Sequence, residues 1–420
     1  MFTSAESNRL MSFPVETVLA LWQQVPASIQ LLVWGVVLFT LIALIGQVAV
    51  VFMVLMERKV LAWMTQRKGP NRVGPWGLLQ TVADGVKLLF KEDIMTPDQD
   101  KWLFTLAPVI FFLPAFVLYA FIPLTRDWVA LQLPLAALAI FAISSISVIG
   151  IVLAGLASNN KYSLLGGMRS AAQAISYEIP LVMSVLAVVV FAGSANLHVI
   201  VEKQNQGLGL LNWFWLSITP ISFLIFLISS IAEVNRIPFD LPEAESELVS
   251  GYNTEYSGMK FAMFFLAEYA ALFAMSALTV IFFFGGYYSP IGGLLVEKLG
   301  IVESLNQSLS GLGQLVAQLE MVIWLLSKTY LFIFLAMWLR ATLPRLKPDQ
   351  LMGFSWKFLI PLSLINIFLV AIEKLWLTHN MSLLYFVLWA GTLLLGVGGF
   401  SVLMSRIFTG KLSARLVKIS

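Results

Sequence analysis

Three ionisable residues lie inside long apolar stretches of this 420-residue chain: Glu178, Glu268 and Lys328. An ionisable group at the depth of a lipid bilayer is costly unless it is paired or hydrated, so it marks a candidate functional position. A buried pair of Glu with Lys would be a purely structural explanation. Three such groups instead favour a hydrated polar path, in which the two carboxyl groups could load and release protons.

A second set of carboxyl groups is crowded into residues 233–255, which also contain Arg236. The segment holds six of the 23 acidic residues of the chain: Glu233, Asp240, Glu243, Glu245, Glu247 and Glu255. The simpler interpretation is a solvated acidic face that docks a basic partner. The alternative is a cluster of carboxylates that repel one another and share protons. The three alternating glutamates lack the Gly and Asp or Asn spacing of a calcium-binding loop, so no metal site is predicted.

The composition limits what kind of protein can carry these groups. The chain is 59% hydrophobic and only 12% charged, with a mean hydropathy of +0.87. Soluble domains average about 45–50% apolar and about 25% charged residues. A soluble enzyme and a disordered chain are therefore excluded, and a net charge of +3 is too balanced for a nucleic-acid partner. A multi-pass membrane protein remains.

The residues that usually hold redox groups are scarce. The chain has no Cys and only two His, His198 and His379, which are far apart and fall in predicted outer loops. We therefore expect no metal, haem, flavin or iron–sulfur cluster on this chain. No phosphate loop or complete dinucleotide-binding glycine motif is present either. Any electrons that pass near this protein would be carried by something else.

The apolar runs themselves predict the elements that position these groups. A bilayer-spanning helix needs about 20 apolar residues, and continuous rather than alternating runs exclude spanning strands. We predict an all-α integral membrane protein with about nine transmembrane helices. The runs are 31–56, 102–122, 131–157, 171–191, 213–232, 261–284, 321–339, 358–372 and 383–404.

The distribution of basic residues predicts the orientation. With nine spans, the odd-numbered loops and the C-terminal tail hold 20 of the 26 Lys and Arg, the N-terminus and the other loops hold 5, and Lys328 lies within a span. Basic residues concentrate in the loops on the cytoplasmic side. The N-terminus is therefore expected outside and the C-terminus inside, facing the cytoplasm or the matrix.

The first predicted inner loop carries both charge and a fixed turn. Basic residues crowd its start, and Gly and Pro punctuate residues 69–75. An amphipathic pattern follows, with Asp84 and Lys87 paired on its polar face, which predicts a helix in the membrane interface. Its apolar positions are Leu78, Leu79, Val82, Val86, Leu89 and Phe90. This segment is either an anchor facing anionic lipid or one wall of an opening for a lipid-soluble molecule.

Several of these motifs occur together in one known family. The most specific is the acidic block Ala232-Glu-Val-Asn-Arg-Ile-Pro-Phe-Asp-Leu-Pro-Glu-Ala-Glu-Ser-Glu247. Others are Glu57-Arg-Lys59, Gln66-Arg-Lys-Gly-Pro-Asn71, the segment 158–169, Ser176-Tyr-Glu178, Ala267-Glu-Tyr269 and Trp338-Leu-Arg340. Taken in chain order, these motifs extend over about residues 50–372. Over this range the chain resembles the H subunit (the mitochondrial subunit 1 type) of respiratory NADH:quinone oxidoreductase, in the membrane arm of complex I.

The resemblance implies a role for each matched position. In that family this subunit forms the membrane part of the quinone chamber, and the resemblance assigns the chamber to Glu57, Arg58, Arg67, Asp84 and Lys87. It assigns a proton path to Glu178, Glu233, Arg236, Asp240, Glu243, Glu245, Glu247, Glu255 and Glu268. Channel-lining charges are expected at Arg169, Lys328, Arg340 and Arg345. The bound substrate would be a quinone, with ubiquinone preferred, and the iron–sulfur donor would sit on a partner subunit.

The resemblance also sets the expected organisation, partners and location. Residues 1–29 would be an outer extension, 30–372 the eight-span domain with an outer loop at 286–320, and 373–420 an added span with a basic tail. Soluble quinone-site and iron–sulfur subunits, small and antiporter-like membrane subunits and the lipid bilayer would surround it. We expect the bacterial inner membrane, with the mitochondrial inner membrane as the alternative. Two other functions stay open: the ion-translocating membrane anchor of a hydrogenase-type complex, and a stand-alone secondary transporter.

Overall fold

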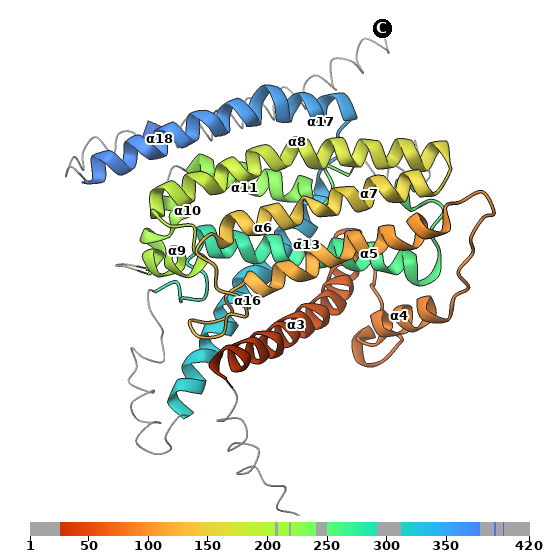
Figure 1. Ribbon diagram of the computed structural model, residues 1–420, viewed down its shortest axis with the longest axis horizontal. Coiled ribbons are helices and arrows are strands. Elements are labelled where there is room, and N and C mark those ends of the chain that lie inside the picture. The colour runs from red at the N-terminus through yellow and green to blue at the C-terminus, as the bar shows by residue number, and fades with distance from the viewer. Residues whose placement is uncertain are drawn as a thin grey trace, which may run out of the picture.

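The computed structural model describes residues 26–205, 209–217, 220–240, 250–291 and 312–378, together with positions 390, 391 and 398. Every regular element in these ranges is helical (Figure 1). The first half contains α3 (Ala27–Met64), η1 (Pro75–Gly77), α4 (Gln80–Phe90), α5 (Lys101–Val117), η2 (Leu118–Phe121), α6 (Ala136–Ser144), α7 (Ile146–Ala157) and α8 (Lys161–Ala192). The all-helical fold class is confirmed for the described part of the chain.

The second half continues in the same way. Its elements are α9 (Leu197–Gln204), η3 (Gly209–Asn212), α10 (Phe214–Ser217), α11 (Pro220–Glu233), η4 (Gly251–Asn253), α13 (Gly258–Phe283), α16 (Leu312–Thr342), α17 (Pro348–Phe354), η5 (Ser355–Leu359) and α18 (Ile360–Thr378). The predicted ninth span, 383–404, lies outside the described residues.

Six helices of the described part are long and apolar enough to cross a membrane. They are Lys101–Phe121, Ala136–Ala157, Lys161–Ala192, Gly258–Phe283, Gly313–Thr342 and Pro348–Leu375, and Pro220–Glu233 is a shorter apolar helix. The predicted first span lies within α3, which is 38 residues long. The multi-pass character is therefore confirmed, whereas the count of nine spans and the orientation of the termini stay predictions.

The helix boundaries differ from the predicted spans where a helix continues through polar residues. Helix α8 begins ten residues before the predicted span, because the Asn160 side chain accepts a hydrogen bond from the Tyr162 amide and caps the helix there. The helix ending at Thr342 begins at Leu312, so part of the predicted outer loop is helical. The predicted eighth span is too short, because the helix continues through Lys357 in a π-helical turn.

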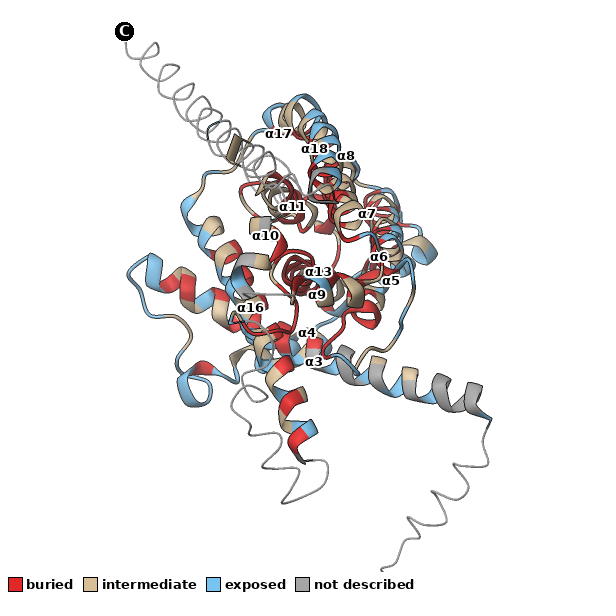
Figure 2. Ribbon diagram, turned by 90° about the vertical axis from the view of Figure 1, so that its left-hand side faces the viewer, coloured by how far each residue is buried: buried red, intermediate tan, exposed pale blue. Residues whose placement is uncertain are grey.

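Helix α13 is the centre of the bundle, with α16, α3, α11 and α5 around it (Figure 2). Most of its side chains are buried, so its surface is covered by protein rather than by lipid. A helix that is apolar on all sides is typical of this central position. Glu268 is carried on this central helix, and its environment is therefore set by the surrounding helices.

The loops predicted to share one side of the membrane contact one another. Asn160 donates to the Glu255 carboxylate at 2.7 Å, and the Leu346 amide donates to the Pro238 carbonyl at 3.1 Å. At the other end of the bundle, Arg126 lies 3.6 Å from Glu202. The odd-numbered loops in these contacts therefore lie at one end of the bundle, and the even-numbered loops lie at the other.

Candidate functional site

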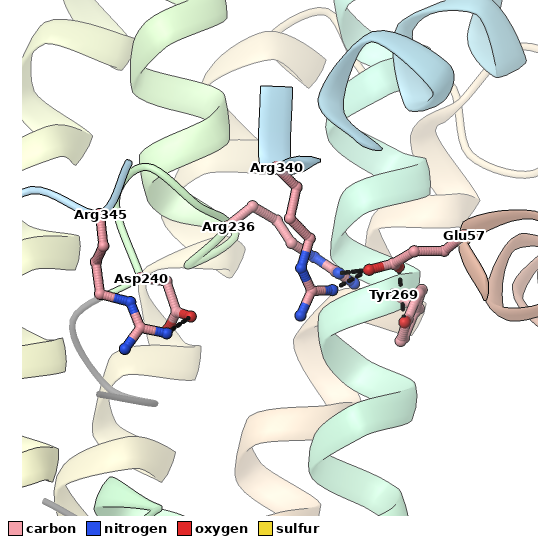
Figure 3. Close-up of polar contacts among 6 residues, drawn as sticks. All are labelled: Glu57, Arg236, Asp240, Tyr269, Arg340 and Arg345. Carbon is pink, nitrogen blue, oxygen red and sulfur yellow. Dashed lines mark hydrogen bonds and ion pairs between the residues drawn. The ribbon is translucent and has the colours of Figure 1, made fainter. Parts of the chain in front are cut away.

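A buried carboxylate on α3 joins three helices. Glu57 is only 3% exposed and accepts hydrogen bonds from the Arg236 guanidinium at 3.0 Å and from the Tyr269 hydroxyl at 2.8 Å. Arg340, near the end of α16, forms a second ion pair with the same carboxylate. Both guanidinium groups converge on Glu57 (Figure 3). We call Glu57, Arg236, Tyr269 and Arg340 the Glu57 cluster.

The Glu57 cluster compensates charges that could not otherwise be buried. A buried carboxylate or guanidinium is tolerated only when it is paired and hydrogen-bonded. The Arg236 guanidinium also lies over the Tyr269 ring, 4.3 Å from its centroid. Burial alone would lower the pKa of Arg236, but the Glu57 carboxylate raises it above its ordinary value, so Arg236 stays charged.

Two donor atoms of Arg236 face no acceptor. Its Nε and Nη2 atoms are buried and have no hydrogen-bond partner among the described residues. A cavity of about 20 Å³ lies beside them, lined by Arg236, Asp240, Glu268, Tyr269 and Arg340 together with Asn235, Ile237 and Phe265. This space exceeds the roughly 10–15 Å³ that one water molecule needs. A water here could accept from Arg236 and contact Glu268.

A second and larger cavity lies against the first. Its volume is about 40 Å³, enough for two or three waters, and it is lined by Glu233, Glu268, Asn235, Ser144 and Ser147, with apolar side chains of α5 and α13. Glu268 and Asn235 line both cavities. The structure thus brings Glu233, Arg236, Asp240 and Glu268 to one polar region, as the proposed path requires.

The segment that carries these groups is held by Gln173, which sequence reasoning missed. The Gln173 amide, on α8, donates to the carbonyls of Ala232 and Phe239 at 2.8 and 2.6 Å and to Asn235 at 3.2 Å. It therefore fixes both ends of residues 232–239. Tyr252 was also missed, and its hydroxyl donates to Glu268 at 2.9 Å. Neither residue is charged, so the charge pattern gave no signal for either, although Tyr252 belongs to the Gly251-Tyr-Asn253 end of the block that carries the resemblance.

The predicted entry region is built from α3, the turn after it and α4. Arg58 pairs with Asp84 at 2.5 Å, and Lys87 lies 3.8 Å from the same carboxylate, so the predicted pairing of Asp84 with Lys87 is confirmed. Arg67 is exposed in the turn. The apolar positions predicted for this helix are exposed as well, up to 87% at Phe90. The helix was expected to run about 16 residues, but the α-helical part spans only Gln80–Phe90.

Gly77 fixes the path of the turn, and we expect Gly77→Ala to distort it. The residue has a φ of +78°, and a Cβ there would lie 2.3 Å from the Pro70 carbonyl oxygen. A left-handed conformation costs an alanine roughly 1–2 kcal/mol even without a clash. Quinone-linked activity of the assembled complex should therefore fall in the variant. Gly85→Ala, on the next helix with open space around its Cβ position, should leave it unchanged. Equal activity of both variants would contradict this.

Several predicted site residues lie elsewhere. Glu255 is held by Asn160 and lines neither cavity described above. Lys328 donates to the carbonyls of Phe284 and Tyr288, at the end of α13 about 24 Å from Glu268 by helix rise. Arg169 and Glu178 are half-buried on α8, and Arg345 pairs with Asp240 at 2.9 Å. Glu243, Glu245 and Glu247 lie outside the described residues, as does His379.

No group of three or more His, Asp or Glu in the described ranges is arranged to hold a metal ion. The polar region offers carboxyl groups, guanidinium groups and tyrosine hydroxyls. Carboxyl groups beside water-sized cavities can exchange protons with bound water. The guanidinium groups of Arg236 and Arg340 line the same cavity as Glu268.

Comparison with known proteins agrees with the resemblance. The family model described as NADH dehydrogenase matches residues 36–371. This chain belongs to that family. The NADH-quinone oxidoreductase H subunit of Brevibacillus brevis is 48% identical over 357 residues, covering 84% of this chain and 96% of the relative. Subunit 8 of the Rhodothermus marinus enzyme is 49% identical over 316 residues, with 75% and 90% covered, and the H subunit of the Bacillus thuringiensis enzyme is 48% identical over 342 residues, with 81% and 93% covered.

Proposed function

We propose that this chain is the membrane-embedded quinone-chamber subunit of a proton-pumping NADH:quinone oxidoreductase of a bacterial inner membrane. It carries no redox group of its own in this proposal. The substrate is a membrane quinone, and the electron donor sits on a soluble partner subunit. Membership of the NADH dehydrogenase family and the names of the relatives support this assignment.

The observation that carries the coupling proposal is the position of two neighbouring residues on α3. Arg58 pairs with Asp84 on the entry helix, while Glu57 pairs with Arg236 and Arg340 beside the polar cavities. A charge change or a movement at the quinone entry is therefore transmitted over one residue of α3 to the groups around Glu268. Electrostatic coupling in a low-dielectric interior is strong enough to shift proton occupancy at this range.

The proton path of the proposal begins at the cavity beside Arg236 and continues through Glu268 to Glu233. Glu178 joins it, because its carboxylate is close enough to Glu233 for the two to repel each other. Two carboxyl groups that repel each other share protons. They pass a proton on more readily than two carboxyl groups that do not interact. Partner membrane subunits receive the proton from this end of the path.

Isolation of the native complex through a tag on this chain tests the proposal. We expect the complex to oxidise NADH, to reduce a short-chain ubiquinone and to contain flavin and iron on its other subunits. If menaquinone is the better acceptor, only the identity of the quinone in the proposal changes. A complex that contains nickel and produces hydrogen, or a chain that purifies alone and moves a solute in liposomes, would contradict the proposal.

Arg67→Ala is expected to weaken quinone-linked activity without affecting earlier electron transfer. Arg67 is an exposed cation in the turn between α3 and α4, so its removal leaves the packing of both helices intact. We expect a loss of roughly threefold to tenfold in NADH:quinone activity, because losing one hydrogen bond from the guanidinium costs about 0.5–1.5 kcal/mol. Reduction of a water-soluble artificial acceptor should be unchanged. An equal loss in both assays would indicate misassembly and not a role in the entry.

A further inference from the structure

A chain of cavities runs along one side of α13 and ends at a cluster of aromatic rings. A third cavity, of about 20 Å³, is lined by Ser230, Ser276, Thr279 and Phe332 together with apolar residues of α11, α13 and α16. Met275 lines both this cavity and the 40 Å³ cavity beside Glu268. The space can hold about one water next to three hydroxyl-bearing residues. Small cavities therefore continue from Glu268 toward the far end of α13, with Met275 between the second and the third.

Three phenyl rings close this extension. Phe332, which lines the third cavity, lies 4.8 Å from Phe284 and 6.1 Å from Phe223, and Phe223 lies 5.2 Å from Phe284, all between ring centroids. The rings come from α16, from the residue after α13 and from α11, so they fill the space between three helices. Trp215 stacks on Phe284 at 5.7 Å. We call Phe223, Phe284 and Phe332 the phenyl triangle.

A cation covers the phenyl triangle on the side away from the cavities. Lys328 is one helical turn before Phe332 on α16, and its ammonium group donates to the carbonyls of Phe284 and Tyr288 at 2.8 and 2.9 Å. The same group lies 4.7 Å from the centroid of the Trp213 ring. Its position at the C-terminal end of α13 also complements the helix dipole. These contacts fix the amino group of Lys328 directly beyond the rings.

We propose that the phenyl triangle and Lys328 form a proton seal that closes the cavity chain toward the other side of the membrane. Apolar constrictions exclude water, and the Lys328 side chain fills the space beyond the rings with its amino group already bound to two carbonyl groups. Protons that enter at the Arg236 side can then leave only sideways through Glu233, and cannot cross this subunit. This inference rests on the proposed proton path, and it assigns Lys328 a barrier role instead of a place in the path.

Passive proton leak in the resting complex tests the seal. The whole complex is reconstituted in liposomes that contain a trapped pH-sensitive dye, with valinomycin and potassium present and NADH absent. We expect Phe332→Ser to collapse an imposed pH gradient roughly tenfold faster than the native complex, because a barrier lower by about 1.4 kcal/mol gives that change. Gradient retention equal to that of the native complex, at equal amounts of reconstituted protein, would overturn the proposal.

Two control variants separate the seal from general damage. Phe332→Leu keeps an apolar side chain in the triangle and should retain the gradient. Phe334→Ser makes the same substitution two residues further along α16 at a side chain that is 38% exposed, and it should also retain the gradient. Leak in either control as large as in Phe332→Ser would reject the seal. If Phe332→Ser does not assemble, Phe223→Thr is used in its place. Faster collapse of the pH gradient in that variant would support the seal, and retention of the gradient would overturn it.

Water in the native complex provides a test that needs no variant. High-resolution density should show ordered water between Ser230 and Thr279 and none between Phe332 and Lys328. A continuous line of waters through the triangle would overturn the seal. The leak assay uses a resting complex, so its result is independent of turnover. Gradient retention by Phe332→Ser together with loss of pumping in Glu268→Gln would reject only the seal. Leak in Phe332→Ser together with normal pumping in Glu268→Gln would reject only the path.

Discussion

Replacing Glu57 with alanine is expected to lower the stability of this subunit within its complex by about 3–5 kcal/mol, the usual cost of removing one partner of a buried ion pair. Arg236 and Arg340 would be left side by side without the carboxylate that both contact. Arg236 is only 7% exposed, so its charge would remain largely buried without its partner. The amount of assembled complex on native gels and its thermal inactivation temperature measure the effect.

Two companion variants show whether uncompensated charge is the cause. Asp84→Ala breaks the ion pair to Arg58, which is partly exposed to solvent, and should cost about 1 kcal/mol. Adding Arg236→Met to Glu57→Ala removes one of the stranded charges and should restore part of the stability. A Glu57→Ala complex as heat-stable as the native one would show that the Glu57 cluster is not needed for assembly.

Glu268→Gln should abolish most proton translocation while the complex still assembles. Glutamine keeps the size of the side chain and can still accept the hydrogen bond from Tyr252, but it cannot carry a proton. We expect the number of protons moved per NADH to fall by roughly tenfold or more, since proton transfer by a positioned carboxyl contributes at least that much. Dye quenching in sealed liposomes measures translocation, and reduction of an artificial acceptor measures the intact electron input.

Glu255→Gln is the matched control for this experiment. It makes the same substitution in the same acidic part of the chain, but Glu255 is held by Asn160 and lines neither cavity beside Glu268. Its pumping should equal that of the native complex. Normal pumping by Glu268→Gln would remove Glu268 from the path, and equal loss in both variants would point to a general effect of charge at this end of the bundle.

The sequence predicted the helices well because apolar length is a local property. Each span needs enough consecutive apolar residues to cross the bilayer, and that requirement can be counted along the chain. The errors occurred at ends that depend on local hydrogen bonds, such as the Asn160 cap that starts α8 early. Lys357 borders the predicted eighth span, but one exposed basic residue does not stop a helix.

The candidate site was predicted only in part. The resemblance singled out Glu57, Arg236 and Arg340, but it placed them in three different groups, as chamber, path and channel residues. The structure joins them in one cluster, although Glu57 is 179 residues from Arg236 and 283 from Arg340. Lys328 stays a predicted channel charge, and the structure shows that it donates to two carbonyl groups at the far end of α13. Nothing in the spacing of these residues indicated either arrangement.

The sequence by itself determined that this protein is a multi-pass helical membrane protein of the NADH dehydrogenase family with carboxyl groups within apolar helices long enough to cross a membrane. Those features follow from composition, run length and motif, which need no knowledge of neighbours. Only the tertiary structure decided which charges meet and where the cavities and rings lie. The reason is physical: the cost of a buried charge depends on the helix packed against it, and helix neighbours are set by long-range packing rather than by local pattern.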